Sequence, residues 1–213
     1  MALAIMAKTP RLNHTKTRLA VDIGDEAALA AHINLVQDTL TRLRRQALVR
    51  AVSGVSDISG VNVDITLWVT EVDASTEAWA REFDVPLHQQ VGQGLGERMH
   101  YILSNLLGRG ASSACLVGAD CPLIDSSYVA QAFLRLCHAD LVFGPAEDGG
   151  YGLIGLNQAK PEIFEGISWG SHSVLEESLA VAEKLNLRVE NLPTVWDIDT
   201  LPDWQRYLAY CRH

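Results

Sequence analysis

An acidic residue and a cluster of cations follow two apolar runs, at positions where a sheet would present them to a ligand. Asp120 follows the run Ala114–Val117 after Gly118 and Ala119, and four lysines and arginines between residues 8 and 18 follow the run Ala2–Ala7. Open parallel sheets bind ligands beyond the carboxyl ends of their strands. If these two strands are neighbours, the carboxylate and the cations meet across one cleft, which suits a nucleoside diphosphate or triphosphate with a metal ion.

Lys16 and Arg18 flank Thr17 in the segment after the first apolar run, which we expect to be a loop. Alternating cations can straddle a diphosphate through charge-assisted hydrogen bonds. The alternative is a solvated basic loop. The segment lacks the glycines of a Walker motif, so it is not a P-loop.

Asp120 is a candidate ligand for Mg²⁺ or Mn²⁺, which often take only one or two protein carboxylates and complete their shell with phosphates and waters. The alternative is a helix cap or a turn. Asp197 and Asp199 stand two residues apart, so both carboxylates would point the same way from an extended segment and could supply a second ligand. Alternatively, Asp199 or Thr200 caps the last helix.

Glu147 and Asp148 precede Gly149-Gly150-Tyr151, where the glycines would let the backbone approach a ligand while an acid faces it. A general base or an acceptor for a sugar hydroxyl fits this pattern, and a tight hairpin with exposed acids is the alternative. Trp169 could stack on a sugar or a base, or be a half-buried core residue.

Three further signals are negative. The glycines of Gly92–Gly96 are spaced Gly-x-Gly-x-Gly, which is not the dinucleotide-binding fingerprint. The seven histidines form no convincing catalytic arrangement, and the absence of Gly-x-Ser-x-Gly speaks against serine hydrolase chemistry. The four cysteines lack zinc-site spacing and are expected to be reduced.

The composition is that of a water-soluble enzyme. The 213 residues are 48% hydrophobic and 20% charged, and we expect a single domain over residues 1–213. The net charge of -9 argues against binding to nucleic acid. Without a signal peptide or a membrane-spanning segment in the sequence, we expect a cytoplasmic protein with no membrane partner. A homo-oligomer stays open.

Strand and helix patterns alternate along the chain, which is typical of a parallel sheet. Residues 46–62 are less regular and are expected to be a loop or a frayed helix end. The expected strands are 2–6, 63–69, 86–90, 114–117, 140–144, 151–156 and 188–192, and the expected helices are 25–44, 75–83, 96–107, 126–137, 173–185 and one from 202, with Asp25 as an N-cap and Ser173 and Glu176 as a capping box.

In this order, seven motifs resemble one bacterial family. They are Met6-Ala7-Lys8-x-Pro10, Lys16-Thr17-Arg18-Leu19, Leu95-Gly96-Glu97-Arg98-Met99, Gly118-Ala119-Asp120-Cys121-Pro122, Gly144–Tyr151, Trp169-Gly170 and Asp197-Ile198-Asp199-Thr200. The chain resembles the glycosyltransferase-A-like family catalogued as a domain of unknown function, some members of which are labelled arsenosugar-biosynthesis glycosyltransferases.

The resemblance implies the nucleotide-diphospho-sugar transferase fold, a Rossmann-like three-layer α/β/α sandwich with a mostly parallel mixed sheet, and a divalent cation, Mg²⁺ or Mn²⁺. It implies that Lys16 and Arg18 meet phosphates and that Asp120 and Asp199 hold the metal. The segment with Gln93, Gly94 and Gly96 would lie near the nucleobase, and Asp148, Gly149, Gly150, Tyr151 and Trp169 would face the acceptor. Unlike many members, the chain has Gly152 where a second aromatic residue is common.

These observations predict a metal-dependent glycosyltransferase that moves a sugar from a nucleoside-diphosphate sugar to a small acceptor. Lys16, Arg18 and the cation would stabilise the leaving diphosphate, and Asp148 is the candidate acceptor base. A nucleotidyltransferase that condenses a nucleoside triphosphate with a sugar phosphate or phospho-acid is the nearest alternative. A noncatalytic nucleotide-binding protein is the third.

Overall fold

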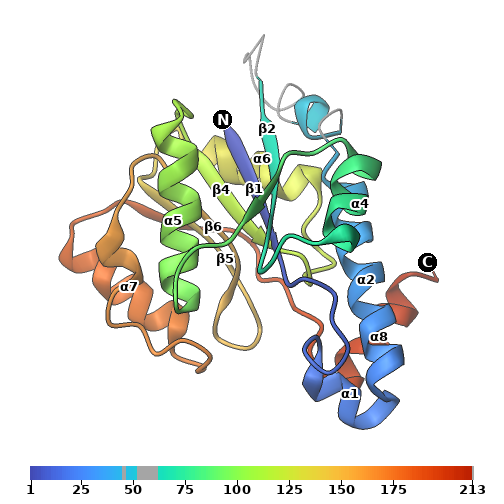
Figure 1. Ribbon diagram of the computed structural model, residues 1–213. Helices are drawn as coiled ribbons and strands as arrows, with labels where there is room; N and C mark the ends of the chain where they lie inside the picture. Colours follow the sequence, from blue (N-terminus) through green and yellow to red (C-terminus); the bar gives the residue numbers. More distant parts are fainter. Residues whose placement is uncertain (45–46, 52–61, 213) are drawn as a thin grey trace.

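The computed structural model describes residues 1–44, 47–51 and 62–212, which form a three-layer α/β/α sandwich around a seven-stranded sheet (Figure 1). The strand order is β3-β2-β1-β4-β6-β5-β7. Among the strands of the described residues, β6 alone runs antiparallel to its neighbours, and the other pairs are parallel. The strands are β1 (Ala2–Ala7), β2 (Asp64–Val69), β3 (Leu87–Gln89), β4 (Ala114–Gly118), β5 (Leu141–Pro145), β6 (Tyr151–Leu156) and β7 (Val189–Asn191).

The central strands are apolar along their whole length because helices cover both faces of the sheet. In β1 every residue but Met6 is buried, and in β4 all but Gly118. The segment 146–150 between β5 and β6 is too short for a crossover, since parallel neighbours need a connection of about a dozen residues or more. This short link explains the reversed direction of β6.

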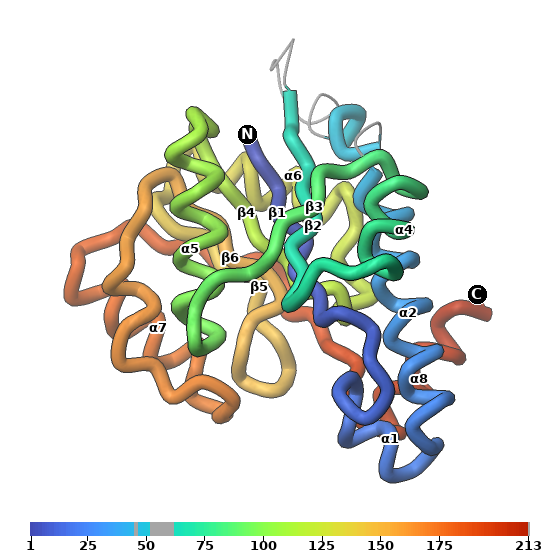
Figure 2. Tube along the Cα trace, viewed as in Figure 1, coloured from blue at the N-terminus to red at the C-terminus, as the bar shows by residue number. Residues whose placement is uncertain are grey.

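Five helices build the outer layers (Figures 1 and 2). One apolar cluster joins α2, α4 and α6 to one face of the sheet, and a second joins α5, α7 and the 3₁₀ helix η1 to the other. The sheet thus has an apolar core on each face. The helices are α2 (Asp25–Arg42), α4 (Ala74–Phe83), α5 (Leu95–Gly108), α6 (Ser126–Arg135) and α7 (Val174–Lys184), with η1 at Pro161–Phe164.

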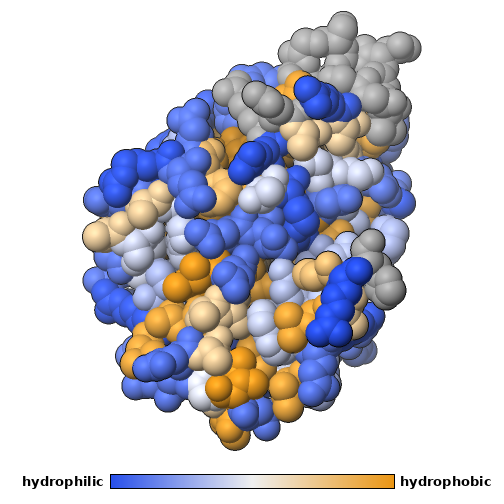
Figure 3. Space-filling view, turned by 90° about the vertical axis from the view of Figure 1, so that its right-hand side faces the viewer, coloured by the Kyte–Doolittle hydropathy of each residue, from blue (hydrophilic) through white to orange (hydrophobic). Residues whose placement is uncertain are grey.

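Two more helices, α1 (Thr17–Ile23) and α8 (Leu201–Tyr210), lie beside the lower end of α2 (Figure 1). A small apolar cluster there contains Leu35, Trp196, Ile198 and Tyr207. Figure 3 shows the side of the molecule that lies at the right in Figure 1. Polar residues cover much of this side, and apolar residues gather in its lower part. This end of the molecule places the C-terminal segment next to the loop that follows β1.

The expected alternation of strands and helices, the mostly parallel mixed sheet and the pairing of β1 with β4 are confirmed. Most of 46–62 lies outside the described residues. Within the described part of the chain, no helix is long and apolar enough to span a membrane.

Three local predictions were wrong. Thr17 begins α1, so Arg18 lies in a helix and not in a loop. Gly24, whose φ is 84°, precedes α2, and Asp25 is its first residue. Ser173 precedes α7 but caps no backbone N–H with its side chain, because its hydroxyl donates to Glu177 Oε1 at 2.7 Å. The causes are the left-handed turn at Lys16, the turn at Gly24 and the hydrogen bond between Ser173 and Glu177, respectively.

Candidate active site

Lys16 and Asp120 meet at the carboxyl ends of β1 and β4. The Nζ atom of Lys16 donates to Oδ2 of Asp120 at 2.8 Å across 104 positions of sequence. The Lys16 side chain is only 8% exposed, whereas that of Asp120 is 40% exposed. Lys16 has φ 49° and ψ 45°, a left-handed conformation that turns the chain into α1. The predicted meeting of a cation and a carboxylate across one cleft is therefore present.

The loop between β1 and Lys16 is anchored by neighbouring elements. Thr9 Oγ1 donates to the carbonyl of Glu71 and accepts from its N–H. His32 Nε2 lies 2.9 Å from the carbonyl of Lys8. Burial lowers the pKa of His32, so the imidazole stays neutral at neutral pH. These contacts hold the loop that delivers Lys16.

A backbone hydrogen bond holds Asp197 and Asp199, near the C-terminus, beside Asp120. Ile198, which is buried in the small apolar cluster with Leu35, Trp196 and Tyr207, donates its N–H to the carbonyl of Asp120 at 3.1 Å. Its two neighbours, Asp197 and Asp199, therefore flank Asp120. Oδ2 of Asp199 accepts from Arg18 at 3.0 Å, in a pair whose side chains are 37% and 75% exposed. Thr200 caps α8 together with Asp203, as the structural alternative predicted.

The electrostatics of this cluster follow from its crowding. Burial opposes ionisation of Lys16, but the charges of Asp120, Asp199 and Asp197 outweigh it and raise the lysine pKa. Burial also opposes ionisation of Asp120, yet the Lys16 charge and hydrogen bond hold the pKa of Asp120 below its usual value. Burial, reinforced by Asp120 and Asp148, raises the pKa of Asp197 to about 6. The site thus has more carboxylates than its lysine can neutralise.

We expect Asp197→Asn to stabilise the protein at neutral pH. Since the pKa is raised to about 6, ionisation of Asp197 costs the folded state stability as the pH rises from about 4 to about 6. With allowance for solvent screening, the variant should gain about 1 kcal/mol at pH 7 and nothing below pH 4. Urea denaturation across this range checks the prediction. Asp22→Asn, at an exposed position of α1, is the control. A gain in stability from Asp197→Asn that does not change with pH would contradict the prediction.

Two adjoining cavities open at this cluster. The first, of about 370 Å³, lies between the ends of β1 and β4, and we call it the β1–β4 cavity. Its charged lining residues are Lys8, Lys16, Arg98, Asp120 and Asp199. Apolar side chains, among them Leu95 and Met99, form another part of its wall. A volume of a few hundred Å³ with convergent polar groups is typical of a small-molecule site.

The second cavity, of about 260 Å³, lies beside the start of β6, and we call it the β6 cavity. It contains Asp148, Gly150, Tyr151 and Trp169, which the family resemblance places near an acceptor, and also Asp197. Asp148 accepts the N–H of Gly150 at 2.9 Å. The residues common to both cavities are Leu95, Met99, Gly118, Asp120, Tyr151 and Gly152. Asp120 therefore stands where the two spaces meet.

The loop of residues 146–150 is held from two sides. Arg206 of α8 makes two hydrogen bonds to Glu147, at 2.8 and 3.1 Å, and stacks over the ring of Trp196. On the other side, Gly149 accepts from the N–H of Leu175 at 2.9 Å. Glu147 is thus engaged in holding the loop that carries Asp148.

Gly149→Ala is expected to destabilise the protein by about 2 kcal/mol more than Gly110→Ala. Both glycines have positive φ, at 89° and 95°, so each alanine carries the same backbone strain of about 1 kcal/mol. A Cβ at Gly149 would lie 2.1 Å from the carbonyl oxygen of His172, whereas one at Gly110 meets nothing within 4 Å. Paired urea denaturation curves measure the difference, and equal costs would contradict this packing account.

The glycine-rich segment at the start of α5 is held by contacts with α5 itself and with Trp169. Gln93 donates its N–H to Oε2 of Glu97 at 2.7 Å, and Gly94 precedes the helix. A Cβ at Gly96 would lie 2.6 Å from Nε1 of Trp169, so this glycine makes room for the indole. The predicted nucleobase role of Gln93, Gly94 and Gly96 stays a prediction. From the first turn of α5, Leu95 and Arg98 line the β1–β4 cavity.

Packing accounts for Gly152, where the chain departs from the family pattern. A Cβ there would lie 2.7 Å from Sγ of Cys121 and 3.0 Å from Val195. A side chain at this position would require the strand or its neighbours to shift.

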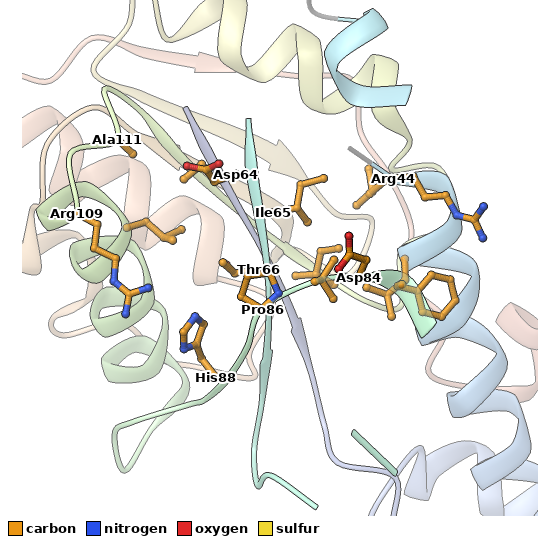
Figure 4. A pocket seen from close by; sticks show the side chains of 16 residues that line it. Arg44, Asp64, Ile65, Thr66, Asp84, Pro86, His88, Arg109 and Ala111 are labelled. Carbon is orange, nitrogen blue, oxygen red and sulfur yellow. The ribbon is translucent and has the colours of Figure 1, made fainter. Parts of the chain in front are cut away.

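A third cavity, of about 310 Å³, lies beside the first half of β2, which β3 does not pair with (Figure 4). Arg109 and His88 lie on one side of β2, and Arg44 and Asp84 lie on the other. Because the strand separates these charged groups, they do not converge on one ligand. We therefore place the candidate active site at the two cavities around Asp120.

Sequence reasoning missed one residue of this region and misjudged the direction of another. Asp197 was paired with Asp199 as a candidate second ligand pointing the same way, but Asp197 lines the β6 cavity and Asp199 the β1–β4 cavity. Gln90, at the end of β3, lines the β1–β4 cavity and carries no sequence signal. Both positions follow from contacts between segments far apart in the chain.

Comparisons with known proteins agree with this fold. A profile of the family described as "Uncharacterized protein conserved in bacteria (DUF2064)" matches residues 58–171. No curated protein matches the chain.

Several solved structures are similar over nearly the whole chain. A candidate nucleotide-diphospho-sugar transferase of Desulfovibrio desulfuricans G20 is 26% identical, with a TM-score of 0.77 over 97% of this chain and 85% of that one. The 4-diphosphocytidyl-2C-methyl-D-erythritol synthase of Anaerococcus prevotii DSM 20548 is 12% identical, with a TM-score of 0.60 over 100% and 98% of the chains. A CMP:2-keto-3-deoxy-manno-octonic acid synthetase in complex with CTP is 10% identical, with a TM-score of 0.54 over 99% and 98%. The last two show the fold alone.

Proposed function

The chain belongs to the bacterial family DUF2064, and we propose that it is a transferase acting on a nucleoside-diphosphate sugar. In this proposal the sugar passes to a small acceptor held in the β6 cavity. One observation carries it: Lys16 and Asp120 form an ion pair where two cavities adjoin, with two more acids beside them. The likeness to the Desulfovibrio protein supports the same class of reaction.

Lys16 would stabilise the leaving diphosphate. Its ammonium is fixed, nearly buried and charged, and a preorganised cation in a partly dry site stabilises developing negative charge more strongly than one in water. Arg18 is far more exposed and would add charge from the rim. Diphosphate binding would compete with Asp120 for the lysine.

The acids fit a divalent cation of the kind that the family resemblance implies. Asp120, with Asp197 or Asp199, offers the hard oxygen ligands that Mg²⁺ and Mn²⁺ prefer. The described residues contain no preformed group of three or more metal-binding side chains, so phosphate oxygens and waters would complete the shell. Burial, with the charges of Asp120 and Asp148, raises the pKa of Asp197, and a bound cation would favour the ionised carboxylate. When bound, the cation supplies positive charge to the diphosphate.

Asp148 is the proposed general base. It lies on an anchored loop at the β6 cavity and would take a proton from the acceptor hydroxyl as the hydroxyl attacks the sugar. Tyr151 and Trp169, whose rings pack edge to face with centroids 6.4 Å apart, would form an apolar wall for that acceptor.

A thermal-shift screen of nucleoside diphosphates, triphosphates and diphosphate sugars, with and without Mn²⁺, tests the proposal. A saturating diphosphate sugar should raise Tm by about 5 °C or more. Slow release of nucleoside diphosphate from that ligand should accompany binding. Release of pyrophosphate from a triphosphate and a sugar phosphate would identify a nucleotidyltransferase instead. Binding without either reaction would identify a noncatalytic nucleotide-binding protein.

A further inference from the structure

Glu177 lies on α7, outside both cavities, and holds one short segment of the chain at two points. Its Oε2 accepts the N–H of Ser168 at 2.6 Å, and its Oε1 accepts the hydroxyl of Ser173 at 2.7 Å. These hydrogen bonds lower the pKa of Glu177, so the carboxylate is ionised at neutral pH. One side chain thus fixes both ends of residues 168–173.

The segment 168–173 forms an outer wall of the β6 cavity. Trp169, Gly170 and Ser171 line this cavity. Trp169 is half-buried, whereas the residues on either side of it, Ser168 and Gly170, are exposed. The segment therefore lies between the solvent and the space proposed for the acceptor.

The Trp169 indole packs against two other elements. Its ring lies edge to face with that of Tyr151 at the start of β6. A Cβ at Gly96 would lie 2.6 Å from Nε1 of Trp169, so the indole rests directly on the first turn of α5. The backbone N–H of Trp169 bonds within the same stretch of chain, to the carbonyl of Ile167 at 2.9 Å. The place of the indole therefore depends on what holds its segment from outside.

The contact between Glu177 and Ser168 is the one beside Trp169. At the other end of the segment, Nδ1 of His172 lies 3.0 Å from the carbonyl oxygen of Asp148, but His172 is exposed and three residues away from the indole. Closed active sites keep water from a reactive donor. We expect loss of the Glu177 carboxylate to let the indole move and admit water to the β6 cavity.

We propose that Glu177 is a positioning residue, which holds Trp169 against the β6 cavity so that the donor sugar passes to the acceptor and not to water. The inference rests on the proposed function, because it assumes that the acceptor occupies this cavity. In either reaction the bond between the sugar carbon and the diphosphate breaks, and the diphosphate keeps the electron pair. The oxygen of the acceptor hydroxyl or of water bonds to that carbon, and its proton goes to Asp148.

The partition of the sugar between glycerol and water tests the proposal. The full chain is given Mn²⁺, the diphosphate sugar found by the thermal-shift screen, and glycerol as a small hydroxyl acceptor. The ratio of glycoside to free sugar does not depend on the amount of folded protein, so a loss of stability alone leaves it unchanged. Divided by the molar ratio of glycerol to water, it should be about 10 or more in wild type and about tenfold lower in Glu177→Ala.

Three further variants make this result specific. Glu176→Ala should keep the wild-type ratio, because Glu176 is the adjacent glutamate of α7, is exposed, and has no hydrogen bond to the segment among the described residues. Glu177→Gln should stay within about twofold of wild type, because its amide can accept from Ser168 and donate to the Ser173 hydroxyl. Trp169→Ala should lower the ratio as far as Glu177→Ala, and the double variant should lower it no further.

Calorimetry with the matching nucleoside diphosphate should give the same affinity in every protein, because the segment does not line the β1–β4 cavity. An unchanged ratio in Glu177→Ala, an equal loss in Glu176→Ala, or additive losses in the double variant would each overturn the proposal. So would a wild-type product ratio equal to that of glycerol to water in the solution. Wild type that neither binds diphosphate sugars nor releases nucleoside diphosphate would instead refute the proposed function.

Discussion

Replacing Asp120 with alanine is expected to lower the transferase rate by about 10³-fold. Its carboxylate occupies the point where the two cavities meet and accepts a hydrogen bond from Lys16, and alanine removes this group while keeping the backbone bond to Ile198. The variant should also lose the dependence of nucleotide binding on Mn²⁺. Steady-state rates and thermal shifts with and without the metal measure both effects.

Two variants make the Asp120 result specific. Asp120→Asn keeps the shape of the side chain but not its charge, and should be nearly as inactive as alanine. Asp140→Ala is the matched control: it breaks the ion pair with Arg188, and the Asp140 side chain is 38% exposed, close to the 40% of Asp120. A folded Asp120→Ala protein with unchanged metal-dependent binding and turnover would remove the basis of the proposed function.

Replacing Lys16 with methionine is expected to lower the rate by about 10²- to 10³-fold, because the preorganised charge facing the diphosphate is lost. Methionine keeps most of the apolar stem of this nearly buried side chain. Without the lysine the pKa of Asp120 should rise, since the Lys16 charge and hydrogen bond hold it down. Affinity for inorganic diphosphate should fall, and the remaining binding should depend less on salt.

Lys184→Met, at the end of α7 and exposed, controls for the loss of one positive charge from the whole molecule. It should leave rate and affinity unchanged. If Lys16→Met matched this control in diphosphate binding, Lys16 would be a structural partner of Asp120 and not a phosphate-binding residue.

Local patterns predicted most of the fold, because strands buried on both faces are apolar throughout and helices have a recognisable period. They failed where tertiary contacts decide. The α1 helix is only seven residues long and begins at Thr17 after a left-handed Lys16, a combination with no strong sequence signal. The order of the strands likewise follows from packing, although the short link before β6 is visible in the sequence.

The candidate site could be predicted only in part. That Asp120 and Lys16 share a cleft followed from their positions after two strands, once those strands were taken as neighbours. Which of Asp197 and Asp199 faces which cavity depends on Ile198, whose burial and bond to Asp120 cannot be inferred from the local sequence. The position of the Gln90 side chain could not be predicted for a similar reason, because the carbonyls of Ala7 and Trp68, in two other strands, hold it.

Because Asp120 belongs to the walls of both cavities, the two compartments cannot be filled independently. Whatever neutralises this carboxylate from one side alters the potential that a molecule meets on the other. Thermodynamic reciprocity then requires that each ligand change the affinity of its counterpart by the same factor. A protein built this way would sense the arrival of one substrate through a single shared charge, without any movement of its backbone.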